Sequence, residues 1–182
     1  KVAKRLDLPP YVIFQDFSLE AMATTYPVTI EELQNIAGVG AGKAKRYGEE
    51  FIAMIKKYVD ENEIERPEDL RVRSVANKSK QKIAIIQAID HRAPLDEFAE
   101  SKGLEFGELL DEIESIVYSG SKINISYYID DVMDEDLQDE IFQYFKESDS
   151  DDLKKAIDEL GDEFSEEEIR LIRIKFLSEL GY

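Results

Sequence analysis

The chain has 182 residues, 43% of them hydrophobic and 35% charged, which suits one mid-sized soluble domain or two small ones. It has no cysteine and a single histidine, His91, so disulfides, thiolate zinc sites, multi-histidine zinc sites and catalytic triads are excluded. No apolar run approaches the ~20 residues that span a bilayer, and no signal peptide is present. We therefore expect a cytoplasmic protein with no membrane partner and no metal site.

The net charge of −18 is spread unevenly along the chain. Residues 1–82 hold 14 Lys and Arg against 13 Asp and Glu, whereas residues 83–182 hold 9 against 28. Such an asymmetry indicates two units with different partners, and the second unit would be repelled by a polyanion. We predict a first domain at residues 1–63, a basic linker at 64–78 and an acidic domain at 79–182.

Short helices are expected throughout the first unit. The opening segment, KVAKRL, reads as the end of a helix that stops before a Pro-Pro pair, so we take the chain as a fragment of a longer protein. Ser18 is expected to cap the next helix, and Thr29 and Glu32 have the spacing of a capping box for the one after it. Apolar residues recur at helical spacing over residues 44–59, which predicts a long helix with one buried face.

A glycine hairpin before this long helix is the main functional clue in the chain. Glycine permits unusual backbone angles and close approach, and the following helix opens with three cations. Backbone N–H groups at a helix N-terminus, together with cations, predict a phosphate-binding edge. The alternative is a tight turn beside a solvated basic face, and the tyrosine after the cations either stacks on a base or lies in the core. The candidate DNA-binding residues here are Gly38, Gly40, Gly42, Lys43, Lys45, Arg46 and Tyr47.

The predicted linker is polar, and Pro67 breaks helix within it. Its cations either follow a phosphate backbone or keep an extended tether in solution. The candidate DNA-binding residues in and beside the linker are Arg71, Arg73, Lys78 and Lys80.

The second unit begins with the outline of a helix-turn-helix. A helix over residues 79–90 precedes LDEFAESKG, which should be a helix ending at Gly103, and a further helix is expected over 106–118. The recognition helix of such a motif usually offers basic, amide or hydroxyl groups to DNA. Here it offers carboxylates instead, at Glu105, Glu108, Asp111, Glu112 and Glu114, which weakens the expectation that it reads DNA.

Helices also dominate the rest of the second unit. Residues 122–129 alternate apolar and polar side chains, so a short β-hairpin strand competes with helix there. Acidic amphipathic helices are expected over 134–146 and 150–160. Ser165 and Glu168 form a second capping-box pattern, which opens a final helix through residue 180.

Two other site patterns fail on their spacing. GVGAGKAK lacks the first glycine and the last hydroxyl of a P-loop, because Ala37 and Ala44 stand at those positions. The aspartates between Asp130 and Asp139 do not place glycine sixth in a calcium loop. No catalytic residue is predicted.

The first unit resembles the HRDC domain of RecQ helicases and RNase D, with the leading helix of the family only partly present. The resemblance rests on three segments in this order: PPYVIFQDFSLEAMA, PVTIEEL and IAGVGAGKAKRYGEEFIAMI. The stretch IIQAIDHRAPLDEFAESKGLEFGELLDEIESIVYSGSKINI is similar to the helix-turn-helix domain that follows HRDC in some bacterial RecQ proteins. The tandem order favours RecQ. The resemblance implies an all-α fold, with an HRDC-like helical bundle followed by a domain built on a helix-turn-helix.

This resemblance implies an accessory DNA-binding region of an ATP-dependent 3′–5′ DNA helicase in repair and recombination, in the bacterial cytoplasm and near the nucleoid. The parent motor would use ATP and Mg²⁺, whereas this fragment is expected to be no enzyme and to hold no cofactor. It would hold single-stranded or junction DNA weakly, through phosphates and without sequence preference. One alternative is a protein-interaction module whose acidic half docks a basic partner or the linker. A further alternative is the accessory region of an RNase D-type exonuclease.

Overall fold

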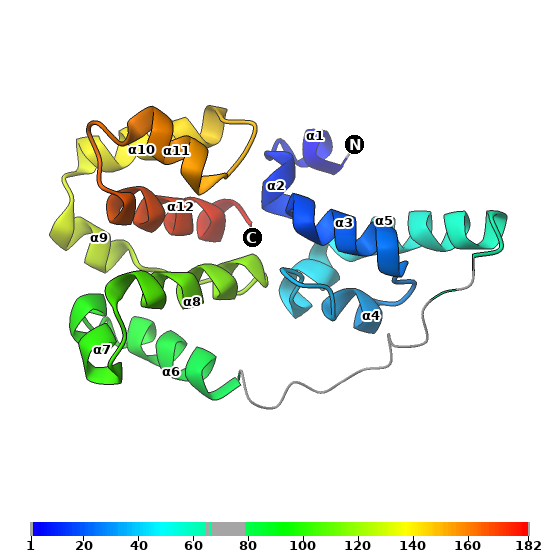
Figure 1. The fold of residues 1–182 in the computed structure, drawn as a ribbon, viewed down its shortest axis with the longest axis horizontal. Helices are drawn as coiled ribbons and strands as arrows, with labels where there is room; N and C mark the ends of the chain where they lie inside the picture. The colour runs from blue at the N-terminus through cyan, green and yellow to red at the C-terminus, as the bar shows by residue number, and fades with distance from the viewer. Residues whose placement is uncertain (1, 65, 67–78, 182) are drawn as a thin grey trace.

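The computed structural model describes residues 2–64, 66 and 79–181, and the regular secondary structure of these residues is entirely helical, as predicted (Figure 1). The helices are α1 (Val2–Leu6), α2 (Pro10–Ile13), α3 (Asp16–Thr25), α4 (Ile30–Gln34), α5 (Ala41–Glu61), α6 (Ser79–Asp90), α7 (Leu95–Lys102), α8 (Phe106–Tyr118), α9 (Ser126–Val132), α10 (Glu135–Glu147), α11 (Leu153–Leu160) and α12 (Glu166–Leu180). None of the described helices is both long enough and apolar enough to span a bilayer.

The β-hairpin considered for the second unit is not found among the described residues. Residues 122–125 are irregular, and α9 begins directly after them. The reason lies in the backbone of Ile123, whose N–H donates to Ser178 Oγ over 3.0 Å and whose carbonyl accepts from the same hydroxyl over 2.6 Å. A single side chain of α12 thus satisfies the groups that a partner strand would otherwise bind.

The caps of the first unit were predicted in part. Thr29 Oγ1 accepts from the N–H of Glu32 over 3.2 Å, so the predicted cap of α4 is confirmed. The prediction that Ser18 caps α3 is wrong, because the helix begins at Asp16 with Gln15 in the cap position. Ser18 lies inside the helix instead, buried, and donates to the carbonyl of Ala37 over 2.7 Å.

The first unit is a small bundle in which α3 and α4 pack beside the long helix α5 (Figure 1). Phe14 stands at its centre, with its ring edge-on to Phe51 at 4.9 Å between centroids and to Tyr47 at 6.3 Å. Leu33 of α4 is fully buried against this group. The bundle therefore presents the start of α5 and the glycine turn before it at one edge.

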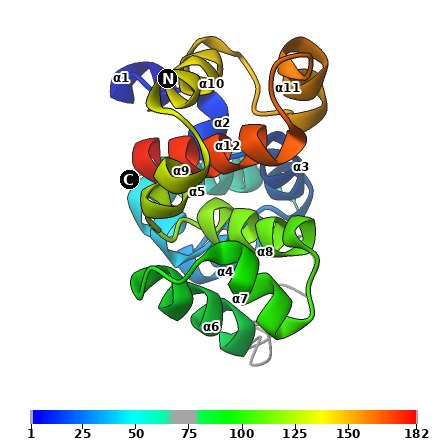
Figure 2. The ribbon, with the colours of Figure 1, turned by 90° about the vertical axis from the view of Figure 1, so that its left-hand side faces the viewer.

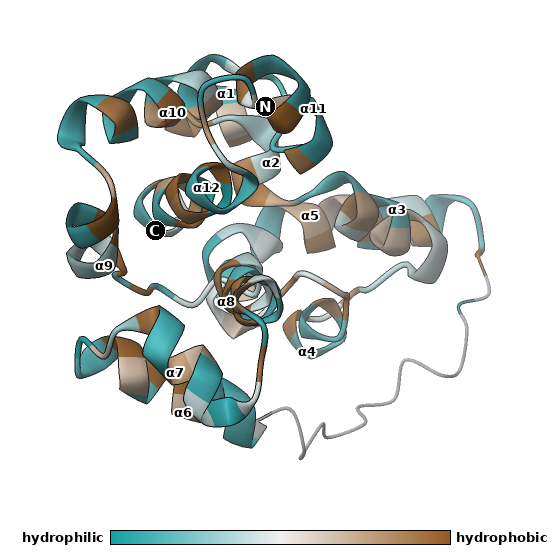
Figure 3. Cartoon of the chain, turned by 60° about the vertical axis from the view of Figure 1, so that its left-hand side comes forward, coloured by the Kyte–Doolittle hydropathy of each residue, from teal (hydrophilic) through white to brown (hydrophobic). Residues whose placement is uncertain are grey.

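Helices of the second unit form successive layers. Figures 1 and 2 show α10 and α11 above α12, then α8, then α6 and α7. Figure 3 shows apolar stretches on α8 and α12, the two helices that the others enclose. The capping box predicted for α12 is confirmed, since Ser165 Oγ accepts from the N–H of Glu168 over 3.3 Å and the Glu168 carboxylate accepts from the N–H of Ser165 over 2.8 Å.

The two units are in direct contact through α2, a helix of four residues. Ile13 and the following Phe14 belong to the first core, whereas Tyr11 and Val12 are buried in the core of the second unit. The Tyr11 hydroxyl donates to the carbonyl of Phe145 over 2.6 Å. The chain therefore has two hydrophobic cores that share one short helix.

Candidate nucleic-acid interface

The glycine hairpin, residues 38–42, connects α4 to α5. Gly38 has φ +76°, a backbone angle that favours glycine, and the Phe17 ring packs over it, so that a Cβ there would lie 2.6 Å from Phe17 Cζ. Gly40 is the residue before α5 and provides no side chain to cap it. The first N–H groups of α5 therefore receive no side-chain cap from their own helix, as an anion-binding edge would need.

In this structure the hairpin backbone also packs closely against the second unit, although Ala41 and Gly42 remain exposed. A Cβ on Gly40 would meet the carbonyl oxygen of Ser119 and lie 2.8 Å from Ser119 Cβ, and a Cβ on Gly42 would meet the carbonyl oxygen of Gly120. Gly120 in turn has φ +84°, and a Cβ there would lie 2.5 Å from the backbone nitrogen of Lys43. We call Ser119 and Gly120 the cover. The glycines thus allow another backbone to approach closely, as expected from the sequence.

Lys43 is buried beneath this cover, so the prediction that three cations share one exposed edge is wrong for Lys43. Its side chain is only 4% exposed. Burial lowers the pKa of the Lys43 amine to about 8, while the nearby Asp151 carboxylate acts in the opposite direction. Lys45 and Arg46, two and three residues farther along the same helix, are exposed as predicted.

Tyr47 belongs to the core, which is the favoured of the two roles considered for it. Its ring is 4% exposed and packs in the first core, with the guanidinium of Arg46 lying 5.4 Å from the ring centroid. The Tyr47 hydroxyl donates to the carbonyl of Gly181 over 3.1 Å, and burial raises its pKa. A base cannot stack on this ring while the two units are in contact.

The cations beyond the first unit have different surroundings. Lys80, on α6, is exposed, whereas Lys82 on the same helix donates to Ser119 Oγ over 2.8 Å. Arg66 is tied to the first unit through the Glu32 carboxylate at 2.7 Å. The candidate residues Arg71, Arg73 and Lys78 lie outside the described residues.

Helix α8 presents no cation to solvent. The exposed side chains of this helix are Glu108, Asp111, Glu112 and Ser115. The remaining carboxylate, Glu114, is buried and accepts from Arg170 Nε over 3.0 Å and from Arg173 Nη2 over 2.9 Å. Because phosphates repel carboxylates, this helix does not supply a DNA-reading surface of the usual kind.

Sequence reasoning missed the contacts of Asp151, which stands in the acidic loop before α11. Its carboxylate accepts from Gln15 Nε2 over 2.6 Å and from the Tyr118 hydroxyl over 3.3 Å, so it joins both units. Burial raises the pKa of this carboxyl. The loop looks like any solvated acidic run, and no local pattern distinguishes this aspartate from its neighbours.

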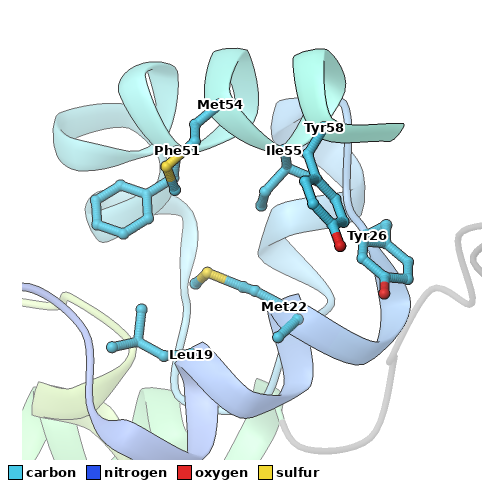
Figure 4. Close-up of a pocket in the computed structure, with 8 residues that line it drawn as sticks. Leu19, Met22, Tyr26, Phe51, Met54, Ile55 and Tyr58 are labelled. Carbon is cyan, nitrogen blue, oxygen red and sulfur yellow. The ribbon is translucent and has the colours of Figure 1, made fainter. Parts of the chain in front are cut away.

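The hollow between α3 and the C-terminal half of α5 is apolar (Figure 4). It has a volume of about 360 Å³, and its lining residues are Leu19, Met22, Ala23, Tyr26, Phe51, Met54, Ile55 and Tyr58. Its only polar side-chain groups are two tyrosine hydroxyls, so it has no acid–base pair. Among the described residues, no group of three or more His, Asp or Glu side chains is placed to hold a metal.

Comparison with known proteins agrees with this architecture. Residues 1–55 match the HRDC domain, and residues 79–129 match the RecQ-1-like helix-turn-helix domain. Over 58 residues, or 32% of this chain, the sequence is 36% identical to the ATP-dependent DNA helicase RecQ of Haemophilus influenzae and 38% identical to that of Bacillus subtilis. The matched segment spans only 9% and 10% of those relatives. The chain thus carries an HRDC domain followed by a RecQ-1-like helix-turn-helix domain, and it matches the C-terminal region of RecQ helicases.

Proposed function

We propose that this chain is the accessory nucleic-acid-binding region of an ATP-dependent 3′–5′ DNA helicase that acts in repair and recombination. The observation that carries the proposal is the tandem order of an HRDC domain and a RecQ-1-like helix-turn-helix domain in one chain. The motor, with its ATP and Mg²⁺, would lie elsewhere in the parent protein. The role of this region would be to hold single-stranded or junction DNA close to that motor.

The exposed face of α5 that carries Lys45 and Arg46 is the described surface that best suits this role. Lys45 and Arg46 are exposed there, and Lys80 is exposed at the start of α6. Neither Lys45 nor Arg46 forms an ion pair with a described residue, so both charges remain available to phosphates. Contacts of this kind are weak, independent of sequence and sensitive to salt.

The test is fluorescence anisotropy with a labelled single-stranded oligonucleotide over a series of salt concentrations. The double variant Lys45→Gln/Arg46→Gln removes two charges from the surface, and Lys56→Gln/Lys57→Gln removes two exposed charges farther along α5. We expect the first variant to lower the slope of log K against log salt by about one to two units. The control variant should keep the wild-type slope. An unchanged slope in the first variant would reject this surface.

A second candidate function is a protein-docking role for the acidic unit. The exposed carboxylates of α8 favour it, because they suit a basic partner better than DNA. The two functions differ in one measurement: if the full chain fails to bind the oligonucleotide even at low salt, the docking role becomes the better explanation. An RNase D-type role accounts for residues 1–55 but not for the RecQ-1-like domain after them.

A further inference from the structure

Two polar side-chain atoms in the described part of the chain, Gln15 Oε1 and Arg173 Nε, are buried without a hydrogen-bond partner. Both residues are more than nine-tenths buried. Their other polar groups are bonded, since Gln15 Nε2 donates to Asp151 Oδ2 over 2.6 Å and the Arg173 guanidinium binds Glu114 and the carbonyl of Asp151. One acceptor and one donor are therefore left over in a network that is otherwise satisfied, although buried polar groups usually have a partner.

The two side chains line one pocket at the junction of the two units, which we call the seam pocket. It has a volume of about 440 Å³. Its walls come from the start of α3 in the first unit, and from the end of α8, the loop before α11 and α12 in the second. Because the leftover acceptor and the leftover donor belong to the same pocket, a single ligand can satisfy both.

The exposed part of the lining is acidic and partly aromatic. Asp16, Asp149 and Asp152 are exposed carboxylates there, against one exposed cation, Lys154. The Phe17 ring is 48% exposed and lines the same pocket, so the alkyl stem of a lysine or arginine can pack on it. These groups attract a cationic ligand and repel a phosphate.

A neighbouring hollow extends the acidic surface towards α8. It has a volume of about 270 Å³, and Phe17 and Tyr118 line it as they line the seam pocket. Asp111 and Ser115, both exposed on α8, also belong to its lining. A ligand longer than one side chain would therefore continue along carboxylates.

We propose that the seam pocket binds a basic peptide segment of a protein partner. A peptide group has an N–H to donate to Gln15 Oε1 and a carbonyl to accept from Arg173 Nε, and the basic side chains of the segment would meet Asp16 and Asp149. The inference rests on the docking role, the second candidate function above, and gives that role a site. It does not depend on DNA binding.

The peptide must displace part of the pocket wall, because neither leftover atom is exposed to solvent in this structure. Residues 148–152 form one side of the pocket and lie outside any helix. A loop of this kind shifts more readily than a packed helix. The new hydrogen bonds to the two leftover atoms would offset the contacts that the shift removes.

The first test is fluorescence anisotropy on the full chain with a short labelled peptide of alternating arginine and glycine. A peptide of alternating glutamate and glycine is its counterpart, and only the arginine peptide should bind at low salt. Asp16→Asn/Asp149→Asn should weaken this binding about fivefold, because each exposed ion pair contributes modestly. The control Asp136→Asn/Asp139→Asn removes the same charge from exposed positions of α10 outside the pocket, and should stay within about twofold of wild type.

NMR spectroscopy of the full chain reports on the leftover atoms directly. The Nε–H signal of Arg173 and the side-chain amide signals of Gln15 should shift when the arginine peptide binds. Arg170 provides the matched internal control on the same helix, because its Nε already donates to Glu114 over 3.0 Å. Its Nε–H signal should move much less.

Equal losses in the two double variants, or equal binding of the glutamate peptide, would overturn the seam pocket as the site. Binding that leaves the Arg173 and Gln15 signals unchanged would overturn it as well, because the peptide would then lie elsewhere on the acidic surface. Absence of peptide binding at low salt would reject the site and the docking role together. Oligonucleotide binding is measured separately on the same samples, so failure of the proposed DNA-binding function is distinguished from each of these outcomes.

Discussion

Helices α5 and α8 begin alike, yet their first turns are satisfied in different ways. Each has glycine as its second residue, Gly42 in α5 and Gly107 in α8. In α8 the Glu108 carboxylate accepts from the N–H of Glu105 over 2.9 Å, so the helix supplies its own anion. In α5 the residue before the helix is glycine, which has no side chain to cap the helix, and the backbone of Ser119 and Gly120 packs beside it. The comparison shows that two helices with glycine in the same position begin with different capping arrangements.

Each of the same two helices also buries one charged side chain, an acid in α8 and a base in α5, but only the acid forms ion pairs with described residues. Glu114 of α8 lies between two guanidiniums that it binds, whereas the side chain of Lys43 in α5 is 4% exposed and forms no ion pair within 4.0 Å with a described residue. Removing the Glu114 charge takes an ion-pair partner from two buried guanidiniums, whereas removing the Lys43 charge takes a partner from no described residue. The two deletions should therefore change stability in opposite directions.

The largest effect is expected for Glu114→Gln. The substitution leaves Arg170 and Arg173 without their shared carboxylate, and both side chains are only 7% exposed. We expect the free energy of unfolding to fall by about 3–5 kcal/mol, measured by urea denaturation. Glu112→Gln, on the exposed face of α8, should stay within about 0.5 kcal/mol of wild type. Equal losses in the two variants would show that the buried network does not contribute.

Lys43→Met should stabilise the protein, by about 1–3 kcal/mol at neutral pH. The pKa of Lys43 falls from 10.5 to about 8 on burial, so between these values the folded state binds fewer protons than the unfolded state. The contribution of this group to stability therefore rises with pH from about 8 towards 10.5 and is lowest below pH 8. The difference between wild type and Lys43→Met should shrink as pH increases through this window.

Denaturation at a series of pH values measures that difference, and Lys45→Met is the exposed control in the same turn of helix. A destabilised Lys43→Met variant would contradict the interpretation that burial of the Lys43 side chain disfavours its charged form.

The smallest effect is expected for Glu108→Ala. It removes the carboxylate that accepts from the N–H of Glu105, and a lost cap of this kind costs about 0.5–1 kcal/mol. Thermal unfolding would show a slightly lower midpoint. A loss in the free energy of unfolding as large as that of Glu114→Gln would show that Glu108 stabilises the protein by more than its capping bond.

Local patterns predicted the helices well and their contacts poorly. Residues 106–118 were predicted as a helix with the bounds observed, and the caps at Thr29 and Ser165 are confirmed, because capping depends on residues three apart. The buried environment of Lys43 depends on Gly120, which is remote in sequence. The periodicity of one segment cannot predict which distant residue packs against it. Lys43 was therefore predicted to be exposed, although it is buried.

The candidate site shows the same division. Exposure of Lys45 and Arg46 follows from their positions opposite the buried face of α5, and the sequence was sufficient to predict it. Ser18 was predicted as a cap because serine favours that role. In the structure Ser18 lies inside α3, where its hydroxyl donates to the carbonyl of Ala37. Tertiary hydrogen bonding overrode a local preference in that case.

The four residues of α2 have a consequence for how the whole chain melts. Their side chains are divided between the two cores, with Tyr11 and Val12 in one and Ile13 in the other. Loss of either core removes packing from α2 and so weakens the other. The described helices should then unfold in one cooperative step, with equal calorimetric and van't Hoff enthalpies. A ligand that binds one unit would raise the melting temperature of both.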